Sequence, residues 1–139
     1  MNTSNFKTAI SQYTQVKTES QVPFATPHRL IQMLMEGVLE KIACAKRHML
    51  NQDVARKGEN ISLAISIVSG LRASLDKEKG LEIAESLDRL YDYMERRLVE
   101  ANARNNPTGL DEVAKLMREI KDGWDAIEGT LSSVTPHQK

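Results

Sequence analysis

Three short segments rich in helix-breaking residues divide this chain into long stretches with helical periodicity. The breakers combine asparagine, aspartate, glycine and proline, and they cover residues 51–53 (NQD), 76–80 (DKEKG) and 105–109 (NNPTG). The sequence between and beside them predicts four helices, over about 26–50, 54–75, 81–104 and 108–131. Because such short connections join neighbouring helices that run in opposite directions, we expect an all-α, antiparallel up-down-up-down four-helix bundle.

Capping signals support these helix starts. Thr26 stands before Pro27, which is the pattern of an N-cap followed by proline at the first helical position. Asp53 is the predicted cap of the second helix, and Thr108 is the predicted cap of the fourth, with Asp111 at the spacing of a capping box.

The composition excludes several classes of protein. The chain has 19 basic and 19 acidic residues, so it lacks the positive surplus that binding to nucleic acid or to a membrane surface needs. A single cysteine, Cys44, excludes an internal disulfide and a thiolate metal cage, and it suits a reducing cytoplasm. No apolar run approaches the ~18 residues of a membrane span, and the N-terminus shows no secretory signal. We therefore expect a cytoplasmic protein that neither binds nucleic acid nor inserts into a membrane.

No pattern of catalytic or metal-binding residues stands out. The three histidines, His28, His48 and His137, are far apart in sequence, and each is interpreted as a solvated or capping side chain. Cys44 lies between two alanines in a predicted helix and is interpreted as an inert buried thiol. A phosphotransfer bundle needs an exposed histidine in the middle of a helix, whereas His48 lies near a helix end. We expect no enzymatic activity, no cofactor and no metal.

Two of the predicted helices carry more apolar surface than one core requires. The last helix has a narrow apolar seam, whereas the first is apolar over a broad arc. In the second, Leu63 and Ile67 form a ridge beside the main apolar stripe. Either this excess packs against neighbouring helices or the N-terminal segment, or it forms a groove for another helix.

The first 25 residues differ from the rest and form a predicted N-terminal arm. Phe6, Ile10 and Tyr13 recur at i, i+4 and i+7, which is the pattern of a latent amphipathic helix. The arm either packs permanently on the bundle or covers a groove until a partner arrives. Residues 26–131 are then the bundle domain, and residues 132–139 are a predicted disordered tail.

Several strings of this sequence resemble the flagellin export chaperone family, FliS. Residues 26–34 (TPHRLIQML) are similar to its opening SPxxLIxML, and residues 90–98 (LYDYMERRL) match LYDYMxRRL. Residues 75–84 (LDKEKGLEIA) resemble LDxEKGGEIA, with Leu81 in place of the second glycine, and Trp124 falls at the family's late tryptophan. The order and spacing of these strings together are highly specific.

The resemblance implies a cytoplasmic chaperone of type III export that binds the C-terminal region of flagellin and prevents its premature polymerisation. It also implies docking on the export gate through the cytoplasmic domain of FlhA. The N-terminal segment of relatives can lie over the binding groove, and Ile10 and Tyr13 match an Ile-x-x-Tyr pair associated with gate docking. Phe6, Ile10 and Tyr13 are therefore the residues predicted to dock on the gate or cover the groove.

We place the client groove mainly on the second helix. Its predicted members are Leu63, Ile67 and Leu71, joined by Met94 and Leu98 of the third helix. In the third helix, Tyr91 is predicted to face the core and Tyr93 to point away. A structural homodimer that buries the same ridge against a second copy is the alternative.

Overall fold

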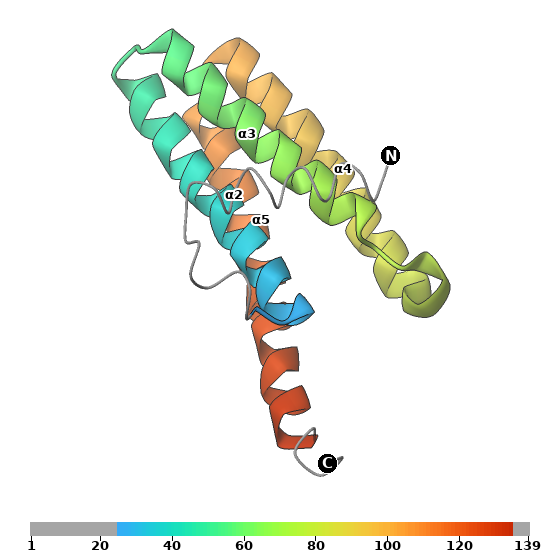
Figure 1. Ribbon diagram of the computed structural model, residues 1–139. Helices are drawn as coiled ribbons and strands as arrows, with labels where there is room; N and C mark the ends of the chain where they lie inside the picture. Colours follow the sequence, from blue (N-terminus) through green and yellow to red (C-terminus); the bar gives the residue numbers. More distant parts are fainter. Residues whose placement is uncertain (1–24, 135–139) are drawn as a thin grey trace.

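The computed structural model describes the backbone of residues 25–134 and the side chains of residues 25–127. These residues form four helices, shown in Figure 1: α2 (Pro27–Leu50), α3 (Val54–Ala73), α4 (Lys77–Arg104) and α5 (Pro107–Val134). The prediction of an all-helical bundle is confirmed in this part of the chain. The predicted arm up to residue 24, with Phe6, Ile10 and Tyr13, and residues 135–139 lie outside the described residues.

Contacts between helix ends show how the bundle is arranged. His28, at the start of α2, contacts Trp124 of the second half of α5. Lys46, near the end of α2, pairs with Asp111 in the first turns of α5. Each helix packs against two neighbours, α2 and α4 each lying between α3 and α5. Helices α2 and α5 therefore run in opposite directions, and Figure 1 shows the chain reversing its direction from each helix to the next.

Side-chain caps fix where the helices begin. Thr26 and Asp53 each accept a hydrogen bond from the backbone N–H three residues later, at 3.0 Å and 3.2 Å, as predicted. The prediction that Thr108 caps the last helix is wrong. Instead, Asn106 Oδ1 accepts a hydrogen bond from the Thr108 N–H at 3.1 Å. The helix begins at Pro107, whose missing N–H costs nothing in a first turn.

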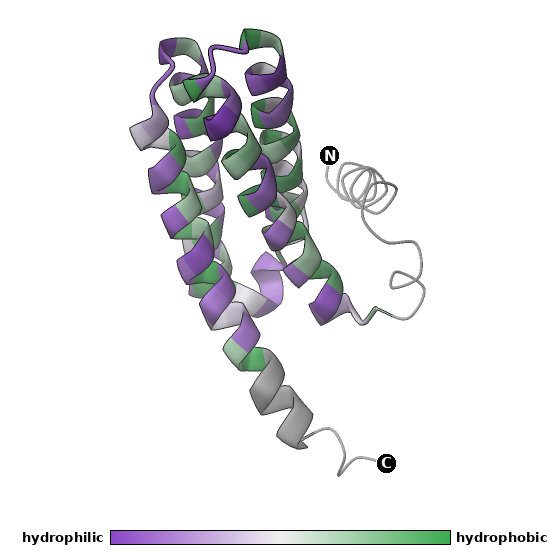
Figure 2. Ribbon diagram, turned by 90° about the vertical axis from the view of Figure 1, so that its left-hand side faces the viewer, coloured by the Kyte–Doolittle hydropathy of each residue, from purple (hydrophilic) through white to green (hydrophobic). Residues whose placement is uncertain are grey.

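The core draws side chains from every described helix. Its fully buried members are Leu34, Met35 and Val38 of α2, Ile61, Val68 and Leu71 of α3, Met94 and Leu98 of α4, and Leu110, Val113 and Met117 of α5. Hydrophilic residues lie mainly on the outer surfaces of the helices (Figure 2). Much of the excess apolar surface of α2 and α3 is thus used inside the bundle, because each of these helices touches two others.

Helix α4 contains a break close to its start. It begins at Lys77, capped by Asp76, earlier than the predicted start at Leu81. Leu81 then has φ 48° and ψ −122°, a backbone conformation that favours glycine and costs another residue about 1–3 kcal/mol. The backbone at Gly80 also lies close to Ala84, since a Cβ on Gly80 would be 2.7 Å from the Cβ of Ala84. The first turn of α4 is therefore set off from the rest of the helix.

Candidate functional site

An apolar cleft of about 760 Å³ lies at the end of the bundle that carries the α3–α4 turn. It is lined by the first half of α2, the end of α3, the first half of α4 and the second half of α5. Figure 1 shows the α3–α4 pair diverging from the α2–α5 pair toward this end. We call this end of the bundle the open end. The opposite end, with the connections at residues 51–53 and 105–106, is the closed end.

Apolar side chains make up most of the cleft lining. They are Pro27, Leu30, Ile31 and Met35 of α2, Leu71 and Leu75 of α3, Ile83, Ala84, Leu87 and Tyr91 of α4, and Ile120, Trp124 and Ile127 of α5. Ile83 and Ile127 remain 72% and 47% exposed. Apolar surface gathered in this way is typical of a site that binds a partner or a ligand.

One wall of the cleft is held together by contacts between α2 and α5. The rings of His28 and Trp124 stack with centroids 4.5 Å apart, and the indole N–H donates to the His28 carbonyl at 3.0 Å. His28 Nε2 in turn lies 2.7 Å from the Trp124 carbonyl, which can only accept, so Nε2 carries the proton. The prediction of a solvated or capping histidine is therefore wrong for His28, which joins two helices.

The same wall has a polar outer layer. Gln32 Nε2 donates to Asp125 Oδ1 at 2.6 Å, and Lys121 Nζ pairs with Asp125 Oδ2 at 2.8 Å. The hydrogen bond from Lys121 holds the pKa of the Asp125 carboxyl below its usual value. Lys121 also lies 3.8 Å from Glu36 of α2. These contacts keep α2 and α5 together at the open end.

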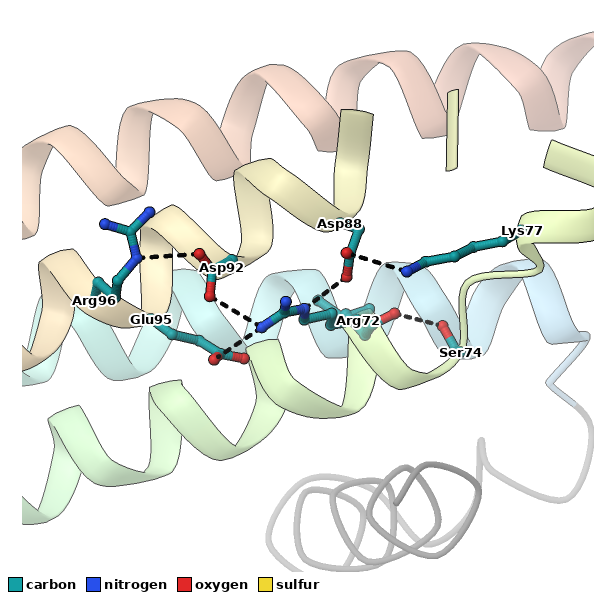
Figure 3. Close-up of polar contacts among 8 residues, drawn as sticks. Arg72, Ser74, Lys77, Asp88, Asp92, Glu95 and Arg96 are labelled. Atoms are coloured by element: carbon teal, nitrogen blue, oxygen red, sulfur yellow. Dashed lines mark hydrogen bonds and ion pairs between the residues drawn. The ribbon is translucent and has the colours of Figure 1, made fainter. Parts of the chain in front are cut away.

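The opposite wall is held by the arginine of α3 that faces several carboxylates of α4 (Figure 3). Arg72 Nε donates to Asp88 Oδ1 at 2.6 Å, and its Nη1 lies 3.2 Å from Asp92 and 3.6 Å from Glu95. Lys77 adds a second cation at 3.2 Å from Asp88. The Arg72 hydrogen bond lowers the pKa of Asp88, whereas burial raises the pKa of Glu95.

Toward the closed end, polar contacts join α4 to α5 and α3 to the end of α4. Tyr93 Oη donates to Glu112 Oε2 at 2.6 Å, and Arg97 Nε donates to Glu112 Oε1 at 2.7 Å, which joins α4 to α5. These two hydrogen bonds lower the pKa of Glu112. Lys57 of α3 is only 5% exposed and donates to Asn105 Oδ1 at 2.6 Å, at the end of α4. The closed end is thus fixed by polar contacts as well as by its core.

The residues predicted to contact a client lie in different surroundings. Leu63 is half-buried, Ile67 and Leu71 are 5% and 2% exposed, and Met94 and Leu98 are fully buried. The interpretation of Ile67 as part of a spare surface ridge is wrong, because the neighbouring helices cover it. Leu71 is the member of this set that lines the cleft. Contact of these residues with a client stays a prediction.

Two further expectations concern single side chains of the core and its border. Tyr91 is 2% exposed and faces the core, as predicted, and burial raises its pKa to about 12. Cys44 is half-buried rather than buried, and its Sγ lies 3.5 Å from Nη2 of Arg47.

The side chains on the α4 face of the cleft, above all Ile83, were not predicted as site residues. The sequence feature that could have indicated them is an apolar residue that follows a turn containing glycine.

The described residues offer little for other chemistry. Between residues 25 and 127, no three histidine, cysteine, aspartate or glutamate side chains are grouped so that they could hold a metal ion. None of the described helices combines the length and the apolar character needed to span a bilayer. The cleft is therefore the feature of this part of the chain that best fits a functional site.

Comparisons with known proteins agree with this picture of a binding protein. A family model described as flagellar protein FliS matches residues 9–131. The flagellar secretion chaperone FliSB of Pseudomonas aeruginosa is 53% identical over 119 residues, which cover 86% of this chain and 94% of that protein. The flagellar secretion chaperone FliS of Salmonella typhimurium is 46% identical over 124 residues, covering 88% and 92%. That of Vibrio cholerae is 38% identical over 127 residues, covering 91% and 93%.

Proposed function

We propose a client for this chain, which belongs to the FliS family and is a flagellar export chaperone. The proposed client is the C-terminal region of flagellin. The apolar cleft at the open end is the proposed binding site. The observation that carries this proposal is a cleft of about 760 Å³ with apolar walls from four helices and exposed isoleucines at its border. The chain acts by binding, without catalysis or a cofactor.

The physical task of such a chaperone is to cover an apolar face until it is needed. A filament subunit carries an amphipathic segment that packs on other subunits later, and this segment aggregates or polymerises early when it is exposed. A helix can place anchors at i, i+3 or i+4 and i+7 into an apolar groove. Ordering a disordered client costs a few kcal/mol, which apolar burial at ~25 cal/mol per Å² can exceed.

We further propose that the N-terminal arm covers the cleft in the absence of client. The described chain begins at Ala25, and Pro27 already lines the cleft, so the arm joins the bundle at the edge of the site. A cover of this kind lowers the apparent client affinity in proportion to the fraction of molecules that are closed. Deletion of residues 1–17 should therefore increase the affinity for client, and unchanged affinity would contradict the cover.

Delivery to the export gate is the last part of the proposal. The chain works in the cytoplasm, and the arm residues Phe6, Ile10 and Tyr13 dock on the cytoplasmic domain of FlhA. Tyr13→Ala should spare flagellin binding and weaken recruitment to FlhA in a pulldown. Normal recruitment of this variant would contradict the assignment.

Calorimetry of the full chain with the C-terminal segment of flagellin from the same organism tests the proposed client. A near-stoichiometric complex with a negative heat-capacity change is expected, because binding buries apolar surface. Trp124, the single tryptophan, lines the cleft, so its fluorescence should change in the same titration. No binding at tens of micromolar would contradict the proposal. A dimer of the chain alone, measured by size, would then favour the homodimer.

A further inference from the structure

The break in α4 places a leucine where the backbone favours glycine. Leu81 has φ 48° and ψ −122°, a region in which a Cβ clashes with the neighbouring peptide groups. A second, steric restriction applies at the neighbouring Gly80, because a Cβ there would lie 2.7 Å from the Cβ of Ala84. The local geometry thus favours glycine at two successive positions, and the chain has glycine at the first alone.

The free protein gains little from this leucine. Its side chain is 67% exposed, so folding removes only a small part of its apolar surface from water. Leu81 therefore adds backbone strain without the packing that normally accompanies a leucine. A strained residue at the edge of a site points to a benefit that is realised in a bound state.

Its position in the chain places Leu81 at the border of the cleft. Gly80 and Ile83, on either side of it, both line the cleft. Ile83 is 72% exposed and Ile127, across the cleft on α5, is 47% exposed. Leu81 itself does not line the cleft, but its side chain is 67% exposed and adds apolar surface next in the chain to residues that do.

We propose that Leu81 determines affinity for the client by contacting the apolar face of the bound flagellin segment. This inference rests on the proposed function above. The backbone conformation sets the direction of the Leu81 Cα–Cβ bond before binding, so the client does not have to reorder the backbone here in order to cover the side chain. The apolar character of the adjoining cleft identifies an apolar helix face, rather than a charged peptide, as the occupant.

Two substitutions at this position separate the side chain from the strain. Leu81→Ala removes the apolar contact and keeps the unfavourable backbone, whereas Leu81→Gly removes both. Each variant should bind the flagellin C-terminal segment roughly ten-fold more weakly than the parent chain in calorimetry. Leu81→Gly should in addition unfold at a temperature roughly 3 °C above that of Leu81→Ala.

Matched variants control for both readouts. Glu82→Gly, at the next position of α4, introduces glycine into ordinary helical backbone and should lower the unfolding temperature. Val99→Ala removes an apolar side chain that is 56% exposed on the same helix but does not line the cleft, and it should leave client affinity unchanged.

Several outcomes would overturn the inference. If both Leu81 variants bound the client with the affinity of the parent chain, the client would not cover this side chain. If the variants instead showed weaker self-association, the leucine would contact a second copy of the chain. A lower unfolding temperature for Leu81→Gly than for Leu81→Ala would show that the backbone at this position is not strained. Failure of the parent chain itself to bind the segment is a separate result, which removes the proposed function and this inference with it.

Discussion

The closed and open ends of this bundle are built from the same helices but differ in what fills the space between them. At the closed end, α5 comes so near α4 that a Cβ on Gly109 would lie 3.1 Å from the Cβ of Ala101. The neighbouring Leu110 and Val113 are fully buried. At the open end, the corresponding space is a cleft of about 760 Å³, and Ile83 at its border is 72% exposed.

This difference indicates how a small domain can carry a binding site without losing its fold. The closed end and the middle of the bundle supply the close packing on which stability depends. The walls of the open end are held in pairs, by His28 and Trp124 on one side and by Arg72 and Asp88 on the other. The cleft between the walls can therefore stay apolar and accessible.

Removal of a core side chain should have the largest effect on stability. Leu98 is fully buried, so Leu98→Ala should lower the free energy of unfolding by about 3 kcal/mol in a urea titration. Ile83→Ala at the open end should change it by less than about 0.5 kcal/mol, because Ile83 is 72% exposed. Equal losses would contradict the division into two ends.

The close approach of α4 and α5 at Gly109 gives a second test of the closed end. Gly109→Val should cost roughly 2 kcal/mol of unfolding free energy, because the new side chain meets Ala101 and Arg97. Gly58→Val is the matched control on α3, since a Cβ on Gly58 has no neighbour within 4 Å. If both variants unfolded at the same urea concentration, the closed end would not depend on this contact.

Loss of the indole at the open end should have a moderate effect. Trp124→Leu removes the stack on His28 and the 3.0 Å hydrogen bond to its carbonyl, which should cost about 1–2 kcal/mol. Trp124→Phe keeps an aromatic ring and should lose less. Thermal unfolding of the two variants measures the difference, and identical losses would show that the stack contributes nothing.

The smallest expected effects depend on pH and have opposite signs within one ion-pair network. Burial raises the pKa of Glu95, so its ionised form costs stability above that pKa, and the cost disappears as the pH falls through it. Glu95→Gln should therefore be more stable than the parent chain at pH 7, by no more than about 1 kcal/mol, because the site is partly solvated.

Asp88 gives the opposite case in the same network. Its pKa is lowered by the Arg72 hydrogen bond, so its ionised form stabilises the fold above the unfolded pKa of ~3.9. Asp88→Asn should be less stable at pH 7, and its difference from the parent chain should shrink as the pH falls through the lowered pKa of Asp88. Unfolding measured from pH 7 to pH 3 checks both signs, and shifts of the same sign would contradict this account of the network.

The sequence predicts the helices better than it predicts the cleft, and the reasons are physical. Local signals determine helix starts, so the sequence predicts the caps Thr26 and Asp53 correctly, although Asn106 rather than Thr108 caps the last helix. Burial depends on which helices become neighbours, which periodicity does not specify, and Ile67 was assigned to the surface for this reason. The cleft depends on how the helix pairs diverge, which follows from tertiary packing rather than from local signals.

The most direct test of the central claim, that the open end binds the client, places a charge at each end of the bundle. Ile83 at the open end and Val54 at the closed end are similarly exposed, at 72% and 67%, so aspartate at either position should leave the fold intact. Calorimetry with the flagellin C-terminal segment should show affinity for Ile83→Asp reduced by at least about ten-fold and affinity for Val54→Asp unchanged. Equal affinities of the two variants, or a loss confined to Val54→Asp, would contradict the account.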